Sequence, residues 1–368
     1  MNHYSCTNCG HDYPPDGFPY RCPTCGGLYD LRSPFLFIPA EVDRSQPGIW
    51  KYRHTFGLAA DSPPISLGEG NSPLLWVEAF TRKVAFKCEY LNPTGSFKDR
   101  GSALIVSWLQ ARGISEAIED SSGNAGSSLA AYSTRVGLKI RIFIPESASG
   151  SKRKQIQAFG AQLVPIRGNR AEVANAVKSV ADGGVVYASH AYLPFNLPGY
   201  ATAAYEIYEQ LGNTMPGAVI VPAGQGGLLL GLARGFEALR IAYRLNYNPP
   251  KMIGVQVRAC APLWARFNNR GIAEASAEEK STLAEGVRVS NPLRAPEVLR
   301  AIQASKGTIF VCDENMIIPG RDALARLGFY VEPTSAIVWS ALEKLIKGLR
   351  DPVVVVLTGS GYKFNLIK

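Results

Sequence analysis

The stretch Leu91-Asn92-Pro93-Thr94-Gly95-Ser96-Phe97-Lys98-Asp99-Arg100-Gly101 decides the fold, because it joins a strand to a helix and places one lysine at the junction. Residues 84–90 are expected to form the strand, and residues 102–111 have the pattern of an amphipathic helix. The Pro-Thr-Gly triplet predicts the turn between them. A lysine near the first turn of a helix opposes the helix dipole. Its position therefore indicates a chemical role for Lys98 rather than a role in helix stability.

The rest of the chain alternates strands and helices with short connections. Strands are expected at 117–120, 139–145, 162–166, 185–188, 218–222, 252–257, 308–312 and 353–357. Helices are expected at 123–136, 152–160, 171–181, 199–211 and 228–244. An uninterrupted apolar strand such as 353–357 suits a parallel sheet that is covered on both faces. The pattern predicts an α/β fold with doubly wound, mostly parallel sheets.

Two further strand-to-helix loops have the composition of ligand sites. Ser121-Ser122-Gly123-Asn124-Ala125-Gly126 follows a strand and opens a helix, where backbone amides point at a ligand. Gly224-Gln225-Gly226-Gly227 allows several amides to converge on one anion at the start of the next helix. No Gly-Lys-Ser or Gly-Lys-Thr follows, so the second loop is not a Walker loop. Taken alone, either loop is also compatible with an ordinary turn.

The ten residues 92–101 resemble the cofactor-lysine signature of fold-type II pyridoxal phosphate (PLP) enzymes, and in this spelling they are most similar to threonine synthases. Residues 66–74 and 357–363 resemble two other segments of threonine synthases. The resemblance implies that Lys98 condenses with the aldehyde of PLP and later moves the α proton of the substrate as a general base.

The same resemblance implies roles for the other loops. Asn124 would bond the phenolic oxygen of PLP, and the neighbouring residues Ser121, Ser122, Gly123 and Ala125 would hold the substrate carboxylate. Gly224, Gln225, Gly226 and Gly227 would hold the phosphate of PLP. Thr358 would lie at the pyridine nitrogen, where a hydroxyl does not enforce ring protonation. A weaker electron sink of this kind suits elimination or replacement at the β or γ carbon.

One part of the chain departs from threonine synthases. Ala125 stands where the family has a threonine after the active-site asparagine, and residues 189–199 lack the arginine that holds the substrate phosphate. An unpaired dianion in a closed site is costly. We therefore expect that phosphohomoserine is not the preferred substrate, with His190 as the candidate to replace the missing contacts. The alternatives are a threonine/serine ammonia-lyase, favoured by Ala125 and the Gly224 loop, and a catalytically inactive zinc-ribbon binding protein.

The resemblance also implies the domain organisation. It predicts the tryptophan synthase β-like, fold-type II architecture, with a large cofactor-binding domain of residues 31–101 and 196–368. A small domain of residues 102–195 would be inserted in it, with the cofactor between the two. Residues 1–30 would form a zinc ribbon. Dimers are common in the family, so a homodimer is expected.

The ribbon is predicted from four cysteines in two knuckles, Cys6-Thr7-Asn8-Cys9 and Cys22-Pro23-Thr24-Cys25. Two thiolates from each knuckle make a closed tetrahedral shell for a structural zinc ion. His3 and His11 lie near in sequence, but four thiolates already satisfy zinc. Disulfides, or a ribbon that keeps its ligands without metal, are the alternatives. Cys88, Cys260 and Cys312 are isolated and are expected in or near the core.

The composition is that of an ordinary globular protein. The 368 residues are 46% hydrophobic and 19% charged, which is enough for two domains with their own cores. The net charge of +9 is scattered along the chain, so nucleic-acid binding is not expected. No long apolar stretch or secretory signal is evident, and we expect a cytoplasmic enzyme without membrane contact. Its expected partner is a small amino-acid substrate.

Overall fold

The computed structural model describes residues 3–32, 34–147, 151–246, 248–270 and 281–364. The contacts of the chain divide it into two compact units. Unit 1 comprises residues 1–70, 98–199 and 365–368, and unit 2 comprises residues 71–97 and 200–364. This division groups residues 31–70 with 98–199, whereas the resemblance assigned 31–101 to the large domain. The implied domain boundaries stay a prediction.

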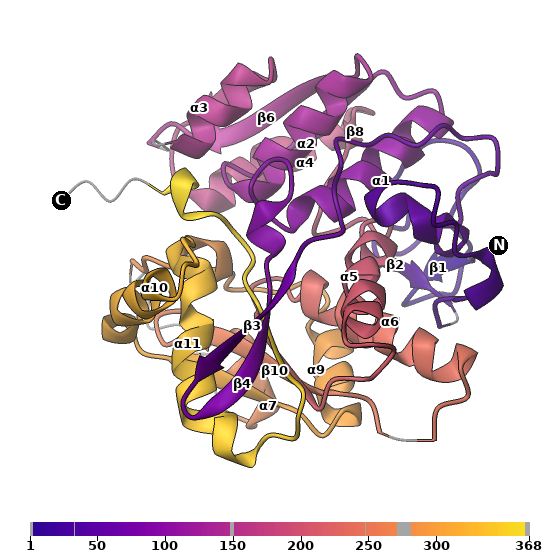
Figure 1. Ribbon diagram of the computed structural model, residues 1–368. Coiled ribbons are helices and arrows are strands. Elements are labelled where there is room, and N and C mark those ends of the chain that lie inside the picture. Colours follow the sequence, from indigo (N-terminus) through magenta and orange to yellow (C-terminus); the bar gives the residue numbers. More distant parts are fainter. Residues whose placement is uncertain (1–2, 33, 148–150, 247, 271–280, 365–368) are drawn as a thin grey trace. The chain divides into compact units, whose positions relative to one another are not determined.

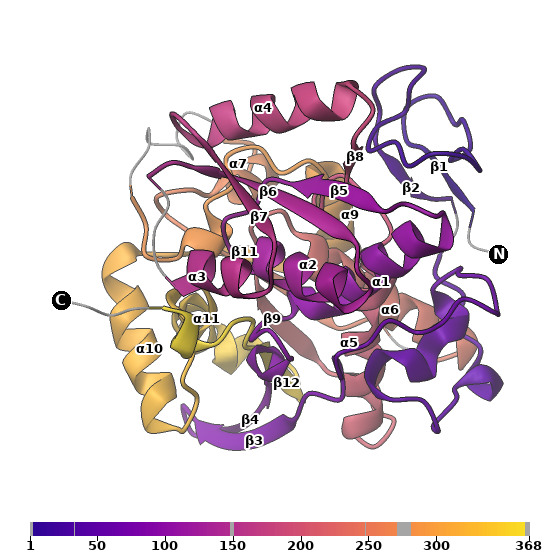
Figure 2. The ribbon, with the colours of Figure 1, turned by 90° about the horizontal axis from the view of Figure 1, so that it is seen from above.

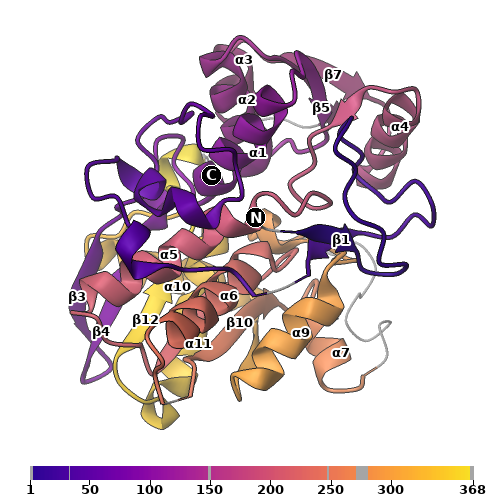
Figure 3. The same cartoon turned by 90° about the vertical axis from the view of Figure 1, so that its right-hand side faces the viewer.

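The centre of unit 1 is a four-stranded parallel sheet with the strand order β7-β6-β5-β8. Its strands are β5 (Glu116–Glu119), β6 (Lys139–Pro145), β7 (Gln162–Ile166) and β8 (Val186–Tyr187). Its helices are α1 (Lys98–Ala111), α2 (Asn124–Arg135), α3 (Ser151–Ala158) and α4 (Arg170–Asp182). Helix α4 covers one face of the sheet, and α1, α2 and α3 cover the other (Figure 2). Figure 3 shows the same separation of α4 from α2 across β5 and β7. The doubly wound arrangement is therefore confirmed for this unit.

The N-terminal segment packs into the core of unit 1. Strands β1 (Tyr4–Cys6) and β2 (Tyr29–Leu31) form an antiparallel pair. The ring of Tyr4 lies 4.9 Å from that of Phe195, and the ring of Phe18 lies 5.2 Å from it, measured between centroids. Because these aromatic side chains are buried, the segment is anchored to the unit through its apolar surface rather than only through its backbone.

Residues 34–64 form an arm that contains two 3-10 helices, η1 (Pro39–Glu41) and η2 (Gly48–Thr55). Trp50 is buried, and its indole Nε1 donates a hydrogen bond to Glu69 Oε1 at 3.0 Å. The other oxygen of Glu69 accepts from the hydroxyl of Tyr132 on α2 at 2.7 Å. These contacts fix the arm to the helical face of unit 1.

Unit 2 is built on a six-stranded sheet with the order β11-β10-β9-β12-β4-β3, parallel except for β3. Its strands are β3 (Leu74–Ala79), β4 (Arg82–Lys87), β9 (Ala218–Pro222), β10 (Lys251–Val257), β11 (Thr308–Cys312) and β12 (Val353–Val356). Its α-helices are α5 (Leu197–Gln210, in this unit from Tyr200 onward), α6 (Gly227–Ala242), α7 (Pro262–Phe267), α9 (Ala295–Ala304), α10 (Ile317–Arg326) and α11 (Pro333–Leu345). Its 3-10 helices are η3 (Glu89–Leu91), η4 (Glu285–Val287), η5 (Glu314–Met316), η6 (Ile346–Gly348) and η7 (Gly361–Lys363).

Helices cover both faces of this second sheet. Figure 1 shows α10 and α11 on one side of the strands and α6 and α9 on the other. Every residue of β9 and β12 is buried, as expected for strands enclosed on both faces. The isolated cysteines Cys88, Cys260 and Cys312 are buried in this unit, which confirms their expected place in the core.

Most of the predicted elements are present within one or two residues, and four strands have the predicted bounds. Helix α1 is the main difference, because it begins at Lys98 itself rather than at residue 102. Among the described residues, no helix has the length and apolar character needed to span a membrane.

Candidate active site

The turn before Lys98 is tied to the loop that follows β12. Gly95 has φ +82°, a left-handed conformation that favours glycine, and its amide donates to the carbonyl of Asn92 at 2.7 Å. The amide of Ser360 donates to the carbonyl of Gly95 at 2.9 Å. The amide of Phe97 donates to the carbonyl of Thr358 at 3.1 Å. The backbone that leads into Lys98 is therefore held by the same loop that carries Thr358.

The first turn of α1 is fixed by the residue after the lysine. Asp99 is fully buried, and its Oδ1 accepts a hydrogen bond from Ser128 Oγ on α2 at 2.5 Å. Ser102 Oγ lies 2.7 Å from the same hydroxyl. A buried carboxylate at the start of a helix is favoured by the helix dipole. It explains why α1 begins earlier than the apolar pattern predicted, and it holds Lys98 at a defined position.

The loop 121–126 brings backbone amides to the start of α2. Gly123 is the N-cap of this helix and provides no capping side chain. A Cβ atom on Gly126 would lie 1.9 Å from the carbonyl oxygen of Ser121, so only glycine lets the helix approach the loop this closely. Both features fit a carboxylate site at a helix N-terminus.

A buried acid–imidazole pair lies on the same unit. Glu119 ends β5, His190 follows β8, and 2.7 Å separates Glu119 Oε1 from His190 Nδ1. The two side chains are 1% and 19% exposed. Burial, reinforced by the charge of Asp120, raises the pKa of the Glu119 carboxyl well above its ordinary value. Burial and then the positive charge of Lys98 lower the pKa of His190 well below its ordinary value. Both pKa shifts favour the neutral form of the group.

In unit 2, the loop 224–227 connects β9 to α6 and has the shape of an anion cradle. Gly226 has φ +80° and forms the N-cap of α6 without a capping side chain. A Cβ atom on Gly224 would lie 2.8 Å from the carbonyl oxygen of Gly286, and one on Gly226 would lie 2.5 Å from the side chain of Val298. Gln225 Oε1 accepts from the amide of Leu293 at 3.1 Å, so this side chain braces the loop.

Thr358 follows β12 and is linked to a serine that was not among the predicted site residues. Ser335 Oγ accepts from the amides of Thr358 and Gly359 at 2.9 and 2.8 Å. Its own proton is then directed at Thr358 Oγ1, 3.0 Å away, or at the Gly359 carbonyl, 3.2 Å away. When the first of these bonds forms, the proton of the Thr358 hydroxyl is left for another acceptor. An unprotonated ring nitrogen is such an acceptor.

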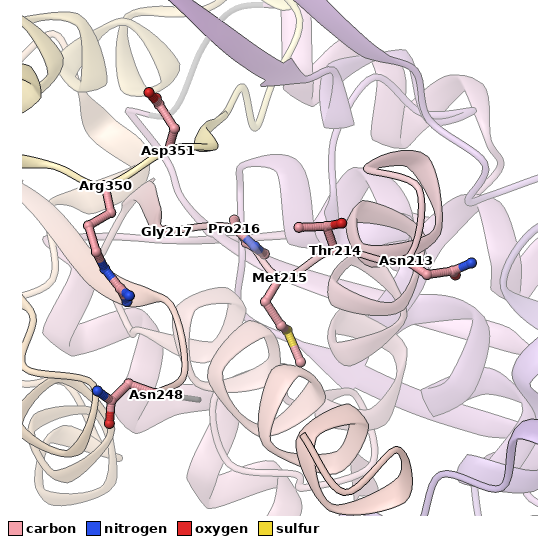
Figure 4. A pocket seen from close by; sticks show the side chains of 8 residues that line it. All are labelled: Asn213, Thr214, Met215, Pro216, Gly217, Asn248, Arg350 and Asp351. Atoms are coloured by element: carbon pink, nitrogen blue, oxygen red, sulfur yellow. The ribbon is translucent and has the colours of Figure 1, made fainter. Parts of the chain in front are cut away.

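A pocket of about 380 Å³ in unit 2 lies at the amino ends of the strands, whereas the 224–227 and Thr358 loops follow their carboxyl ends. Residues 213–217 precede β9 and residues 350–351 precede β12, so the pocket is at the amino ends of these strands. Figure 4 shows Met215 near its centre, with Arg350 and Asp351 coming from the loop before β12. Ligands of parallel sheets bind at the carboxyl ends of strands. This pocket is therefore separate from the candidate site.

The four knuckle cysteines come together as the spacing predicted. Their sulfur atoms all lie within 4.8 Å of one another. Cys6 and Cys22 are buried, whereas Cys9 and Cys25 are exposed. His11 is exposed, and its Nδ1 lies 3.3 Å from Cys9 Sγ. The arrangement brings four thiol groups together, the donor set that a tetrahedral zinc ion requires.

Comparison with known proteins identifies the family. The pyridoxal-phosphate dependent enzyme family matches residues 65–359. The chain belongs to this family. It is 33% identical to a threonine synthase of Methanocaldococcus jannaschii, over 97% of this chain and 92% of that protein. It is 30% identical to a threonine synthase of Methanosarcina acetivorans, over 98% of this chain and 91% of that protein.

Two solved structures share the fold. A T.th. threonine deaminase matches with a TM-score of 0.68 and 25% identity, over 80% of this chain and 94% of that one. Maize serine racemase matches with a TM-score of 0.69 and 21% identity, over 80% of this chain and 89% of that one. The second likeness supports the fold alone. The fold-type II α/β architecture is thus confirmed.

The described residues fit PLP in their chemistry. Unit 1 carries the Lys98 amine and the amides of residues 121–125, and unit 2 carries the 224–227 cradle and the Thr358 hydroxyl. Sequence reasoning could propose these residues because each belongs to a local motif. It did not find Glu119, whose partner is 71 positions away. Nor did it find Ser335, whose partner Thr358 is 23 positions away.

Proposed function

We propose that this chain is a PLP-dependent lyase of the threonine synthase-like group, which catalyses elimination or replacement at the β or γ carbon of a small amino acid. The observation that carries the proposal is the position of Lys98. It is the first residue of α1, and the residue before it is hydrogen-bonded to the carbonyl of Thr358. The relatives named threonine synthase, which span nearly the whole chain, support the same group.

The residues would divide the work as follows. Lys98 would bind PLP and would take the proton from the α carbon of the substrate. The amides of residues 224–227 hold the PLP phosphate at the positive end of α6. Asn124 orients the PLP ring, and the amides of residues 121–125 hold the substrate carboxylate. When bound, PLP supplies the electron sink for the α carbanion.

Thr358 would set the reaction type. It would donate a hydrogen bond to the ring nitrogen of PLP without giving up its proton, because a hydroxyl is a far weaker acid than a pyridinium. Ser335 supports this role because its hydroxyl lies 3.0 Å from Thr358 Oγ1, within reach to donate to it. A ring that is not forced into the protonated state delocalises charge less strongly. This favours loss of a β or γ leaving group over transamination.

A threonine/serine ammonia-lyase is the second candidate. Ala125 is buried at the second position of α2 and offers no hydroxyl to a substrate phosphate, and residues 189–199 contain no arginine. The likeness to a threonine deaminase at 25% identity supports the same candidate. A panel of phosphohomoserine, threonine, serine and O-acetylhomoserine, compared by kcat/KM, separates the two. A clear preference for phosphohomoserine, lost in His190→Ala, would show that the chain has rebuilt a phosphate site.

The PLP assignment has its own test. The purified protein should absorb near the visible edge of the ultraviolet, and borohydride should fix PLP covalently to Lys98. Lys98→Ala should lose this attachment, whereas Lys83→Ala, a lysine of the edge hairpin, should keep it. Undiminished attachment in Lys98→Ala would overturn the assignment. A chain that never acquires the absorbance would instead be the inactive zinc-ribbon binding protein, which the retention of Lys98, Asn124 and Thr358 argues against.

We also propose that Cys6, Cys9, Cys22 and Cys25 hold one structural zinc ion. The support is the convergence of their sulfur atoms within 4.8 Å. Four protein ligands leave no open position for water, so the ion would stabilise the ribbon rather than take part in catalysis. A cytoplasmic homodimer remains a proposal that rests on the family resemblance, and sedimentation of the purified protein tests the dimer.

A further inference from the structure

The roles proposed above for binding PLP do not use the Glu119–His190 pair, which lies in the unit that carries Lys98 and the 121–125 loop. Glu119 lies two residues before that loop, and the charge of Lys98 acts on both members of the pair. Glu119 Oε1 occupies Nδ1 of the imidazole, so Nε2 is the ring nitrogen left for another partner. The side chain of His190 keeps 19% of its surface exposed. The buried Glu119 carboxyl therefore holds one side of the imidazole, and the Nε2 side is left to contact another group.

We propose that His190, backed by Glu119, is the catalytic acid that protonates the leaving hydroxyl group of a β-hydroxy amino acid, an inference that rests on the proposed PLP-dependent lyase. Glu119 is a positioning residue that also refills the imidazole with a proton. The substrate class follows from the pair's chemistry. A hydroxyl is a poor leaving group unless it is protonated, whereas a phosphate departs without an acid.

The proton transfer balances without a charged imidazole. In the starting pair, the Glu119 carboxyl donates to Nδ1 of His190, and Nε2 carries the ring proton. When the Cβ–O bond breaks, its electron pair stays on oxygen, the Nε2 proton moves to that oxygen, and water leaves. Nδ1 takes the proton of Glu119 in the same movement. The electron pair of the Cα–H bond, whose proton goes to Lys98, becomes the Cα–Cβ double bond.

The cycle closes through solvent. The released 2-aminoalkenoate hydrolyses to a 2-oxo acid and ammonium. A water molecule returns a proton to Nε2, and His190 passes its Nδ1 proton back to Glu119. Lys98 loses its extra proton to water, so the protein ends in its starting state.

The surroundings favour a neutral relay. The charged groups near the pair are Lys98 on α1, Asp120 beyond β5, and Arg170 at the start of α4, and Tyr187 on β8 is a neighbouring titratable group. Arg170 is already paired with Asp120, at 2.7 Å between Nη2 and Oδ2. A phosphate beside His190 would meet a neutral imidazole backed by a carboxyl rather than a free cation. A neutral hydroxyl group, in contrast, can accept a hydrogen bond from the neutral imidazole without needing a positive charge.

Glu119→Gln is the sharpest test, because its amide can still donate to Nδ1 but cannot pass on a proton. L-Threonine and L-serine serve as substrates, with the released 2-oxo acid as the readout. In Glu119→Gln and in His190→Gln we expect kcat to fall by about 10²- to 10⁴-fold with little change in KM. Glu116→Gln, at the exposed start of the same strand, is the matched control and should keep its turnover.

Two measurements are independent of turnover. Borohydride attachment of PLP to Lys98 should persist in both variants, which shows that they fold and load. In ¹⁵N-histidine NMR spectra, the wild-type signal that disappears in His190→Gln is assigned to His190. This signal should show the Nε2–H tautomer and no protonation between about pH 6 and 8. The same tautomer should persist in Glu119→Gln.

Each failure has a distinct meaning. Absent attachment in the wild type overturns the proposed function itself. Intact attachment with unchanged turnover in either variant overturns the relay alone, as does an imidazolium signal at neutral pH. A wild type that loads PLP but releases no 2-oxo acid from threonine or serine also overturns the relay. So does a His190→Gln variant that loses only phosphohomoserine turnover, since that result would make His190 a phosphate contact.

Discussion

Arg21 donates a hydrogen bond from Nη2 to the phenol oxygen of Tyr192 at 2.9 Å, and its guanidinium lies 4.8 Å from the centroid of the same ring. Arg21 directly precedes the knuckle residue Cys22, and Tyr192 comes two residues after His190. Tyr20 adds ring contacts to Tyr192 at 5.2 Å between centroids. The second cysteine knuckle is therefore in contact with the segment that carries His190.

Replacement of Cys22 and Cys25 by serine should remove the zinc ion, because two weakly coordinating hydroxyls would replace two thiolates. Metal analysis should fall from one zinc per chain to none. The ribbon cannot form a core of its own, so the variant should also unfold at lower temperature. Cys88→Ser, at a buried cysteine of unit 2, is the control and should keep its zinc. Stoichiometric zinc in the double variant would place the ligands elsewhere.

Arg21→Ala separates the contact with Tyr192 from the metal. It removes one hydrogen bond and one cation–π contact at a partly buried position, which together contribute about 1–2 kcal/mol. We expect that loss in the free energy of unfolding, together with a change in KM, while zinc content is unchanged. Arg32→Ala is the matched control, because Arg32 bonds to Gly10 and pairs with Asp12 within the ribbon. An equal effect of both substitutions would show that the ribbon does not act on the His190 segment through Arg21.

Local motifs gave most of what could be predicted from the sequence. The Lys98 turn, the 224–227 loop and the knuckles each lie within a dozen residues, and their backbone requirements are visible as glycine and proline. The pairing of Glu119 with His190 and of Ser335 with Thr358 is invisible in the sequence, because it depends on which strands and helices become neighbours in the fold. The early start of α1 was missed for the same reason, since Asp99 finds its partner on α2.

Ser335→Ala should weaken both the fold and the hold on Thr358. The substitution leaves the buried amides of Thr358 and Gly359 without their acceptor, which costs about 1–3 kcal/mol in unfolding free energy. It also removes the donor to Thr358 Oγ1, so the absorbance of bound PLP should shift. Ser340→Ala serves as the control, because Ser340 is also buried and lies on the same helix, five residues after Ser335. An unchanged spectrum and stability in Ser335→Ala would contradict the assigned hydrogen bonds.

Glu119→Gln should reduce turnover without reducing stability at neutral pH. The folded-state pKa of Glu119 is raised above its ordinary value of 4.5. Above that pH the unfolded chain releases a proton that the folded chain retains, so the carboxyl makes a contribution to stability that falls as pH rises. Glutamine cannot ionise, so Glu119→Gln removes this pH-dependent loss of stability. Urea unfolding of wild type and variant from about pH 5 to 8 should therefore show a flatter pH dependence in Glu119→Gln.

His190→Gln should instead reduce the loss of stability at acid pH, because a histidine with a lowered pKa destabilises the fold as pH falls through its ordinary value of 6.5. Parallel curves for wild type and both variants would mean that the pair is not held neutral in the folded protein.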